Sequence, residues 1–316
     1  MPEKKVLIVQ YSQSGQLTDV VNSVTAPLAA SDAIELHTLT LNPETPYPFP
    51  WPVLDFFNIF PECVYLDPPA IKPLDIEANQ KFDLVIIAYQ VWFLSPSMPV
   101  TAFLKSAEGK RLLQDTPVVT LIGCRNMWVM AQQAVKKLLT EAGAHLIDNI
   151  VLTDQGSTLA SFITTPRWVL TGRKGSFWGF PPAGIAVSEI QAAKRFGNAI
   201  RDALAKNIEK EGRPLLAGLG AANVDISLVQ SEKAGYRSFL VWGKLLRAIG
   251  KPSNTLRKLI LILYIIFLVT LILTVVPVTM ILQKIMRPLF KKRFQAIKEH
   301  YELPSGSATD RIQNLS

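Results

Sequence analysis

The chain has little of what metal and disulfide sites require. Its 316 residues include two cysteines, Cys63 and Cys124, and three histidines, and the cysteines lack the spacing of a metal or redox motif. No Ser–His–Asp set is evident either. These absences argue against a metalloenzyme and against a hydrolase of the triad type. Two cysteines without a partner motif are typical of a reducing compartment.

The loop after the first apolar run lacks two common nucleotide signatures. Residues 11–18 read Tyr-Ser-Gln-Ser-Gly-Gln-Leu-Thr, without the lysine of a Walker loop or the glycine pattern of a dinucleotide fold. The loop does offer hydroxyl groups and a glycine, and a helix-like segment follows at once. Free N–H groups and the dipole at a helix N-terminus favour an anion, so we predict a phosphomonoester site, such as one for FMN. Its predicted residues are Ser12, Ser14, Gly15, Gln16, Leu17 and Thr18.

Apolar runs of strand length alternate with helical periodicity through the first two thirds of the chain. We expect strands at 4–10, 33–39, 82–88, 116–123 and 145–152, and helices at 17–29, 97–106, 127–142 and 188–208. This alternation predicts an α/β fold with a doubly wound, parallel, five-stranded sheet. Such sheets bind ligands beyond the carboxyl ends of their strands.

Two further loops at that edge combine aromatic and polar residues. Trp92 and Phe93 follow the third strand and can stack on an isoalloxazine ring, and Arg125 follows the fourth. Arg125 can hold an anionic substrate or stabilise a reduced flavin. The alternatives are that the aromatic residues belong to the core and that Arg125 is a solvated surface charge. The predicted flavin contacts are Gln90, Val91, Trp92, Phe93, Leu94, Ser95, Gly123, Cys124, Arg125, Asn126 and Trp128.

Two long segments interrupt the alternation. Residues 42–79 contain nine prolines, and residues 155–187 contain several aromatic residues and a Pro-Pro pair. Their aromatic content argues against solvated linkers. We expect both to pack over the carboxyl edge of the sheet and to line one pocket; the alternative is that they only cover sheet edges.

Charge is divided unevenly along the chain. Residues 1–232 hold 19 Lys and Arg against 22 Asp and Glu, whereas residues 233–316 hold 14 against 3. The basic part flanks residues 259–282, which carry no charge and are long enough, at about 1.5 Å per residue, to span a hydrocarbon core. We therefore expect membrane lipid, and not nucleic acid, as the partner of the basic residues.

These features divide the chain into four parts. We predict an FMN-binding domain at 1–210, a linker and interfacial amphipathic segment at 211–258, a transmembrane or membrane-embedded helix at 259–282, and a basic, then polar, tail at 283–316. The positive-inside rule places the tail in the cytoplasm, where the FMN domain also belongs. Either the tail crosses against that rule or the segment dips in and returns near Pro277. We favour a span, with the FMN domain on the cytoplasmic face.

The three loops together resemble the flavodoxin-like family of FMN proteins and quinone-reductase-type oxidoreductases, over about residues 4–208. In that family the first loop holds the phosphate, and the loops after the third and fourth strands flank the flavin ring. The resemblance implies an FMN-dependent oxidoreductase with a flavodoxin-like fold. NAD(P)H is a further candidate cofactor, and a homodimer is a candidate assembly.

A closer resemblance rests on residues 11–18, 46–51, 89–97 and 125–132. These runs are similar to those of bacterial proteins labelled dialkylresorcinol condensing enzymes, which also carry an apolar segment near the C-terminus. Acyl condensation belongs to thiolase folds, so a flavin fold implies an oxidative step instead: aromatisation of a dialkyl-cyclohexanedione made by a partner ketosynthase. Candidates for its base, or for orienting this lipophilic substrate, are Tyr89, Arg125 and Tyr47. The alternatives are an NAD(P)H-quinone reductase or electron-transfer flavoprotein, and a flavin-free membrane scaffold.

Overall fold

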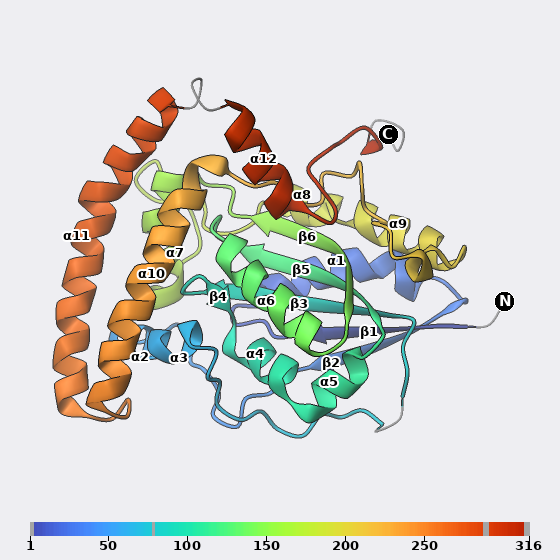
Figure 1. The fold of residues 1–316 in the computed structure, drawn as a ribbon, viewed down its shortest axis with the longest axis horizontal. Helices are drawn as coiled ribbons and strands as arrows, with labels where there is room; N and C mark the ends of the chain where they lie inside the picture. Colours follow the sequence, from blue (N-terminus) through green and yellow to red (C-terminus); the bar gives the residue numbers. More distant parts are fainter. Residues whose placement is uncertain (1–2, 78–79, 287–290, 313–316) are drawn as a thin grey trace.

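A parallel sheet forms the centre of the molecule. The computed structural model describes residues 3–77, 80–286 and 291–312 (Figure 1). The parallel strands lie in the order β2-β1-β3-β5-β6. This is the flavodoxin-like order of a doubly wound sheet, so the predicted fold class is confirmed. The strands are β1 (Lys4–Gln10), β2 (Ile34–Thr40), β3 (Leu84–Trp92), β5 (Pro117–Cys124) and β6 (His145–Thr153).

The sheet has one strand more than the five predicted. β4 (Ser95–Pro96) pairs antiparallel with the end of β3, where Trp92 lies opposite Ser95. The chain reverses tightly there because Phe93 and Leu94 both take positive φ, 49° and 59°. Residues of this size rarely adopt that conformation, so the sequence pattern did not indicate the turn.

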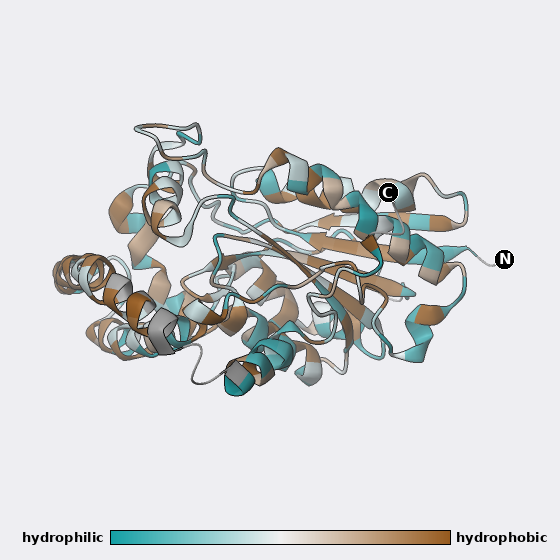
Figure 2. Cartoon of the chain, turned by 90° about the horizontal axis from the view of Figure 1, so that it is seen from above, coloured by the Kyte–Doolittle hydropathy of each residue, from teal (hydrophilic) through white to brown (hydrophobic). Residues whose placement is uncertain are grey.

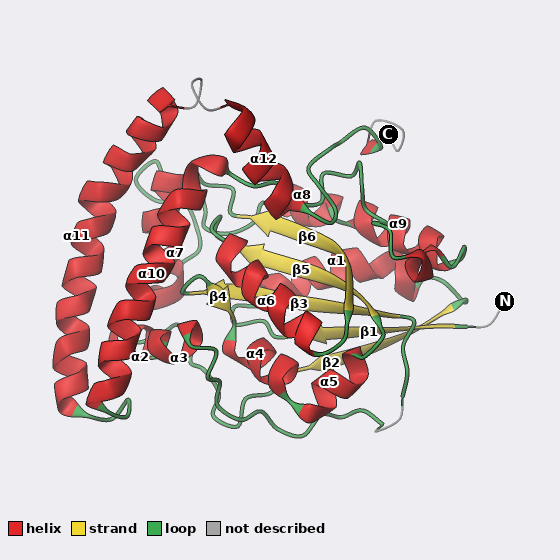
Figure 3. Cartoon of the chain, viewed as in Figure 1, coloured by secondary structure: helices red, strands yellow, loops and turns green. Residues whose placement is uncertain are grey.

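Helices cover both faces of the sheet (Figure 3). Alternate strand residues point to opposite faces, so that Val6 and Ile8 enter one core while Leu7 and Val9 enter the other. The first core is closed by α1 (Gln16–Ala29), α8 (Val187–Ala192), α9 (Lys194–Leu204) and the adjoining 3₁₀ turn (Ile208–Glu211). The second is closed by α4 (Met98–Lys105), α5 (Ala107–Leu113) and α6 (Val129–Glu141).

The described residues of the two aromatic segments lie against each other. Residues 42–79 contain α2 (Val53–Asn58) and α3 (Phe60–Val64), and residues 155–187 contain α7 (Thr158–Thr171). The N–H of Trp51 donates to the carbonyl oxygen of Val169, 2.9 Å away. The ring of Phe49 lies 6.3 Å from that of Trp168. The two segments thus meet beyond the carboxyl ends of the strands.

The chain after residue 210 is part of the same folded unit, which differs from the linker and tail expected there. Leu215, Leu216 and Leu219 are buried in the first core, and Ala221 accepts a hydrogen bond from Val151. The linker prediction failed because these leucines are few and do not repeat with the period of a helix or a strand, so no sequence pattern indicated that they are buried. The helices that follow are α10 (Ile226–Ile249), α11 (Thr255–Met286) and α12 (Lys291–Glu302).

α11 is the long apolar helix predicted for the membrane. Among the described residues, Thr255–Val275 is the one helical stretch long and apolar enough to cross a bilayer. Only 11% of its most apolar part is buried inside the protein. Hydrophobic colouring marks the central sheet and the helices at the left end of the molecule (Figure 2). α11 lies beside α10 as one helix through position 277, so the chain does not turn back there.

Candidate functional site

A cavity of about 230 Å³ lies at the carboxyl edge of the sheet. All three predicted loops contribute to it, and so do both aromatic segments. The structure therefore brings together most of the residues that the sequence singled out. From the loops, the cavity is lined by Ser14, Gln16, Leu17, Gln90, Val91, Trp92, Phe93, Gly123, Cys124 and Arg125.

One end of the cavity is the N-terminus of α1. Gly15 precedes the helix with φ 84°, and no side chain caps the first turn. Nothing lies within 4 Å of the position that a Cβ on Gly15 would take, so the space in front of the helix is open. The Ser12 hydroxyl is buried and has no hydrogen-bond partner among the described residues. N–H groups of a first helical turn and a free hydroxyl are groups that can hold an anion, although Ser12 and Gly15 are themselves not among the residues that line the cavity.

Two glutamines of this loop have a different task. Gln13, which we did not predict as a site residue, donates from Nε2 to the carbonyl of Pro48 at 2.7 Å. The Gln16 amide is buried and exchanges two hydrogen bonds with the backbone of Ile185, at 3.1 and 3.0 Å. The loop thus fixes both aromatic segments over the cavity. Thr18 is half-buried and does not line it.

Aromatic rings form the wall opposite the helix. Trp51 and Trp92 meet edge to face, with centroids 5.9 Å apart, and Phe56 and Phe93 lie 4.8 Å apart. Trp92 and Phe93 line the cavity, and Trp168 completes the wall from α7. A planar, apolar ligand fits such a surface.

Three predicted ring contacts point elsewhere. Leu94 packs with the cluster between α10 and α3, Ser95 is buried in β4, and Trp128 is a core residue with 1% exposure. All three follow the carboxyl end of a parallel strand within a few residues, but the turn at Phe93 and the start of α6 place their side chains outside the cavity. Asn126 lies beside them and donates to Thr158, while its Oδ1 is buried without a partner among the described residues.

Neither tyrosine proposed for catalysis lines the cavity. Tyr89 is fully buried and its hydroxyl donates to Gln132, 2.6 Å away. Tyr47 packs behind the aromatic wall, 5.1 Å from the ring of Trp92. Burial raises the pKa of both tyrosines above its usual value, which opposes a role as base.

Arg125 is the predicted catalytic residue that does line the cavity. Its guanidinium lies 3.9 Å from the centroid of the Phe162 ring and 3.4 Å from the Ser161 hydroxyl. Burial lowers its pKa to about 10, so it remains charged at neutral pH. No carboxylate lies within 4.0 Å of it among the described residues. This leaves a positive charge available to a ligand.

Asp154 and Cys124 also line the cavity near Arg125. Asp154, which sequence reasoning missed, lines the cavity and accepts N–H bonds from Gly184 at 2.5 Å and Gly156 at 2.7 Å. It directly follows the last parallel strand, and this position could have revealed it. Burial raises the pKa of the Cys124 thiol, which therefore stays protonated and serves packing.

Comparison with known proteins gives matches to solved structures. No family model and no curated protein matches the sequence. A flavoprotein in complex with FMN from Lactobacillus acidophilus is 18% identical over 47% of this chain and 93% of its own, with a TM-score of 0.37. Flavodoxin 1 from Bacillus cereus is 12% identical over 62% and 95%, with a TM-score of 0.32. A flavone reductase is 15% identical over 65% and 64%, with a TM-score of 0.34. The fold assignment rests on the strand order given above.

Proposed function

We propose that this protein is an FMN-dependent oxidoreductase that acts on a lipophilic substrate at a membrane surface. The observation that carries the proposal is the cavity itself. It joins an uncapped helix N-terminus to aromatic walls and to the charged Arg125. A phosphate at one end and a flat, apolar ring at the other are the two halves of a flavin mononucleotide.

The residues present fit this group, with one structural consequence. The free Ser12 hydroxyl and the open first turn of α1 would hold the phosphate, and Trp92 and Phe93 would contact the ring. The cavity of about 230 Å³ is smaller than the roughly 300–1,000 Å³ of most ligand sites. Its remaining walls, including Phe49 and Trp168, belong to the two aromatic segments. To admit a whole flavin, the two aromatic segments would therefore have to move outward, because the sheet forms the fixed side of the cavity.

We assign the reaction to oxidative aromatisation of a dialkyl-cyclohexanedione, supplied by a ketosynthase. The acidic dione loses its proton to solvent as it forms the enolate, and the ring then loses a hydride, for which a bound flavin would supply the acceptor. The enolate of such a dione is an anion, and Arg125 is the charged group placed to stabilise it. The aromatic walls exclude water and accommodate the alkyl chains. Turnover also requires an external electron acceptor that reoxidises the reduced flavin, whereas NAD(P)H, a reductant, belongs to the quinone-reductase alternative. A homodimeric assembly also belongs to the proposal.

Comparing FMN with riboflavin tests the phosphate end. We expect the wild-type protein to bind FMN at least tenfold more tightly than riboflavin, since hydrogen bonds to a charged group contribute about 1.5–3 kcal/mol. Ser12→Ala and Ser14→Ala should each weaken FMN binding about tenfold and leave riboflavin unchanged. Ser23→Ala, half-buried on the side of α1 that faces Gln191 of α8 and not among the residues that line the cavity, is the control. Equal binding of both flavins, or of neither, in fluorescence titrations would contradict the proposal.

Turnover assays distinguish dione oxidation from the reaction of a quinone reductase. The loaded protein should oxidise a cyclohexanedione, and Arg125→Gln should lower that rate by about tenfold or more without changing FMN affinity. Reduction of a quinone by NAD(P)H, with no activity on the dione, would instead assign the protein to the quinone reductases or electron carriers. A colourless preparation that binds no added FMN would leave the flavin-free scaffold.

A further inference from the structure

We propose that α11 docks lengthwise into one leaflet of an anionic lipid membrane and does not cross it, so that both ends of the chain stay on one side. This inference rests on the membrane association in the proposed function and specifies its geometry. It differs from both arrangements that the sequence suggested, a span and a return near Pro277.

The surface of α11 fits lipid. Leu259, Leu263, Ile266, Phe267 and Leu273 are all exposed, with fractions from 41% to 69%. Consecutive residues point about 100° apart on a helix, so Ile266 and Phe267 expose more than one side of it. A second protein copy would cover one face of such a helix, whereas acyl chains surround it. Lipid is therefore the occupant that matches the whole exposed arc.

Charge around the helix supports the same partner. Lys244 and Lys251 are exposed on α10 and in the turn after it, Lys258 is exposed at the start of α11, and Lys292 and Arg293 are exposed on α12. Basic side chains beside an apolar segment that is inserted in a membrane bind anionic headgroups. Each contributes about 1 kcal/mol of binding free energy near the membrane surface. An apolar helix with basic residues near both ends matches one face of an anionic bilayer.

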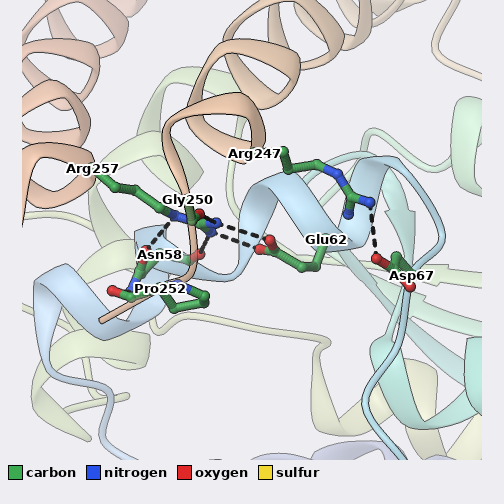
Figure 4. Close-up of polar contacts among 7 residues, drawn as sticks. All are labelled: Asn58, Glu62, Asp67, Arg247, Gly250, Pro252 and Arg257. Atoms are coloured by element: carbon green, nitrogen blue, oxygen red, sulfur yellow. Dashed lines mark hydrogen bonds and ion pairs between the residues drawn. The ribbon is translucent and has the colours of Figure 1, made fainter. Parts of the chain in front are cut away.

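The N-terminal end of α11 is fixed to the folded domain (Figure 4). The Arg257 side chain is 1% exposed and binds Glu62 of α3 through two hydrogen bonds of 3.0 and 2.8 Å. It also donates to the carbonyls of Asn58 and Gly250, and the Asn58 amide donates to Pro252. The turn between α10 and α11 is thus held against α2 and α3. If α10 and α11 entered the membrane as a hairpin, with the turn between them first, that turn would have to break these contacts.

The chain beyond α11 returns to the same domain. Glu302, at the end of α12, accepts from the N–H of Val224 at 2.9 Å. The Ser305 hydroxyl donates to Asp148 at 2.6 Å and accepts from the N–H of Asn149 at 2.7 Å. All three of these β6 and tail residues are buried. If α11 crossed the membrane, these buried partners would lie on opposite sides of it.

A lengthwise position agrees with the dimensions and with the charge rule. Thirty-two residues at about 1.5 Å per residue exceed the roughly 30 Å of a hydrocarbon core, and the helix lies along α10 instead of projecting from the molecule (Figure 1). With no crossing, the basic residues before and after α11 share one side with the flavin domain. The conflict with the positive-inside rule disappears.

The docked helix is also close to the cavity. Tyr264 of α11 lies 4.8 Å from Phe60, and Phe60 lies 5.8 Å from Phe93, which lines the cavity. A layer of aromatic rings thus separates the lipid-facing helix from the site. A substrate with alkyl chains would have a short apolar path between them.

Labelling of the full-length protein in cell membranes tests the one-sided arrangement. Asp310→Cys in the tail and Lys210→Cys in the domain introduce exposed thiols, and the unmodified protein is the blank. We expect a membrane-impermeant maleimide to label both variants in inside-out vesicles and neither in intact spheroplasts. Labelling of the two thiols from opposite sides would overturn the inference and leave membrane anchoring intact.

Flotation with phosphatidylglycerol vesicles tests the docking surface. Ile266→Glu combined with Leu273→Glu should reduce the vesicle-bound fraction at least tenfold, about the effect expected from burying two charges in the membrane. Val187→Glu, at an exposed position on α8, should bind like the wild type. Failure of the wild type to float, or a dimer by light scattering that the double variant converts to monomer, would overturn the docking. FMN titration of the same samples shows separately whether the flavin proposal stands.

Discussion

At the scale of single residues, neighbours in the first loop divide two tasks between them. The hydroxyl of Ser12 is left free for an anion, whereas the amides of Gln13 and Gln16 tie down the covering segments. The anion site could be predicted because its chemistry is local. The partner of Gln16 could not, since Ile185 lies 169 residues further along the chain.

Glu232 provides a pH-dependent test of burial. It is 2% exposed and accepts the N–H of Met130 at 2.6 Å, and burial raises its pKa to about 7 from 4.5, despite the nearby charge of Arg125. Between those values the folded protein binds more protons than the unfolded one. The contribution of Glu232 to stability therefore falls as pH rises through that window, by about 3 kcal/mol.

We expect Glu232→Gln to remove this dependence. Glutamine keeps an acceptor for Met130 but does not titrate, so the variant should match the wild type to within about 1 kcal/mol near pH 5 and be more stable than the wild type near pH 8. Urea unfolding of both proteins at the two pH values measures the difference. Asp148, whose pKa burial raises to about 6, contributes equally to both proteins. Parallel stability profiles would contradict a titrating Glu232.

At the scale of elements, the strands of the sheet were predictable and the C-terminal elements were not. A continuous apolar run such as Leu84 to Ala88 has one stable environment, a buried parallel strand. The apolar run in α11 has two, across a bilayer or along it. Hydropathy reports length and composition only, and the contacts that decide between them, at Arg257 and Ser305, come from residues far away in sequence.

Two helical glycines allow the effect of helix packing to be separated from the effect of helix propensity. Gly197 of α9 faces α1, and a Cβ there would lie 1.9 Å from the carbonyl oxygen of Val24. Gly235 of α10 is also helical, but its Cβ would lie 3.4 Å from Leu94, an ordinary contact. The two glycines have the same propensity cost and different surroundings.

We expect alanine to have opposite effects at these positions. Gly197→Ala should destabilise the protein by about 3 kcal/mol, because α1 and α9 must separate. Gly235→Ala should be neutral or stabilise it by up to about 1 kcal/mol. Thermal and urea unfolding of the two variants provide the comparison. Equal effects would show that α9 does not pack on α1 as closely as described.

At the scale of the whole molecule, one fold carries both a cavity with aromatic walls and the exposed apolar helix α11. The site could be predicted as three loops and two covering segments at one sheet edge, but not which side chains of those segments enter the cavity, because contacts such as that of Phe49 with Trp168 join residues far apart in sequence. The acidic N-terminal part and the basic C-terminal part are likewise not separate domains. The basic part joins the second core of the domain through Tyr301, with Phe294 and Ile297 packed against that core.

The return of the tail to β6 is what makes the chain one unit, so removing it should affect the whole fold. Ser305→Ala leaves the carboxylate of Asp148 and the N–H of Asn149 without this buried partner, at a cost of about 2 kcal/mol or more. Ser307→Ala removes one half-buried hydrogen bond to Glu302 and should cost less, about 1 kcal/mol. Urea unfolding should show a single transition shifted to lower denaturant for Ser305→Ala. If instead the tail alone became protease-sensitive while the unfolding midpoint stayed unchanged, the tail would be an appendage and not part of the cooperative core.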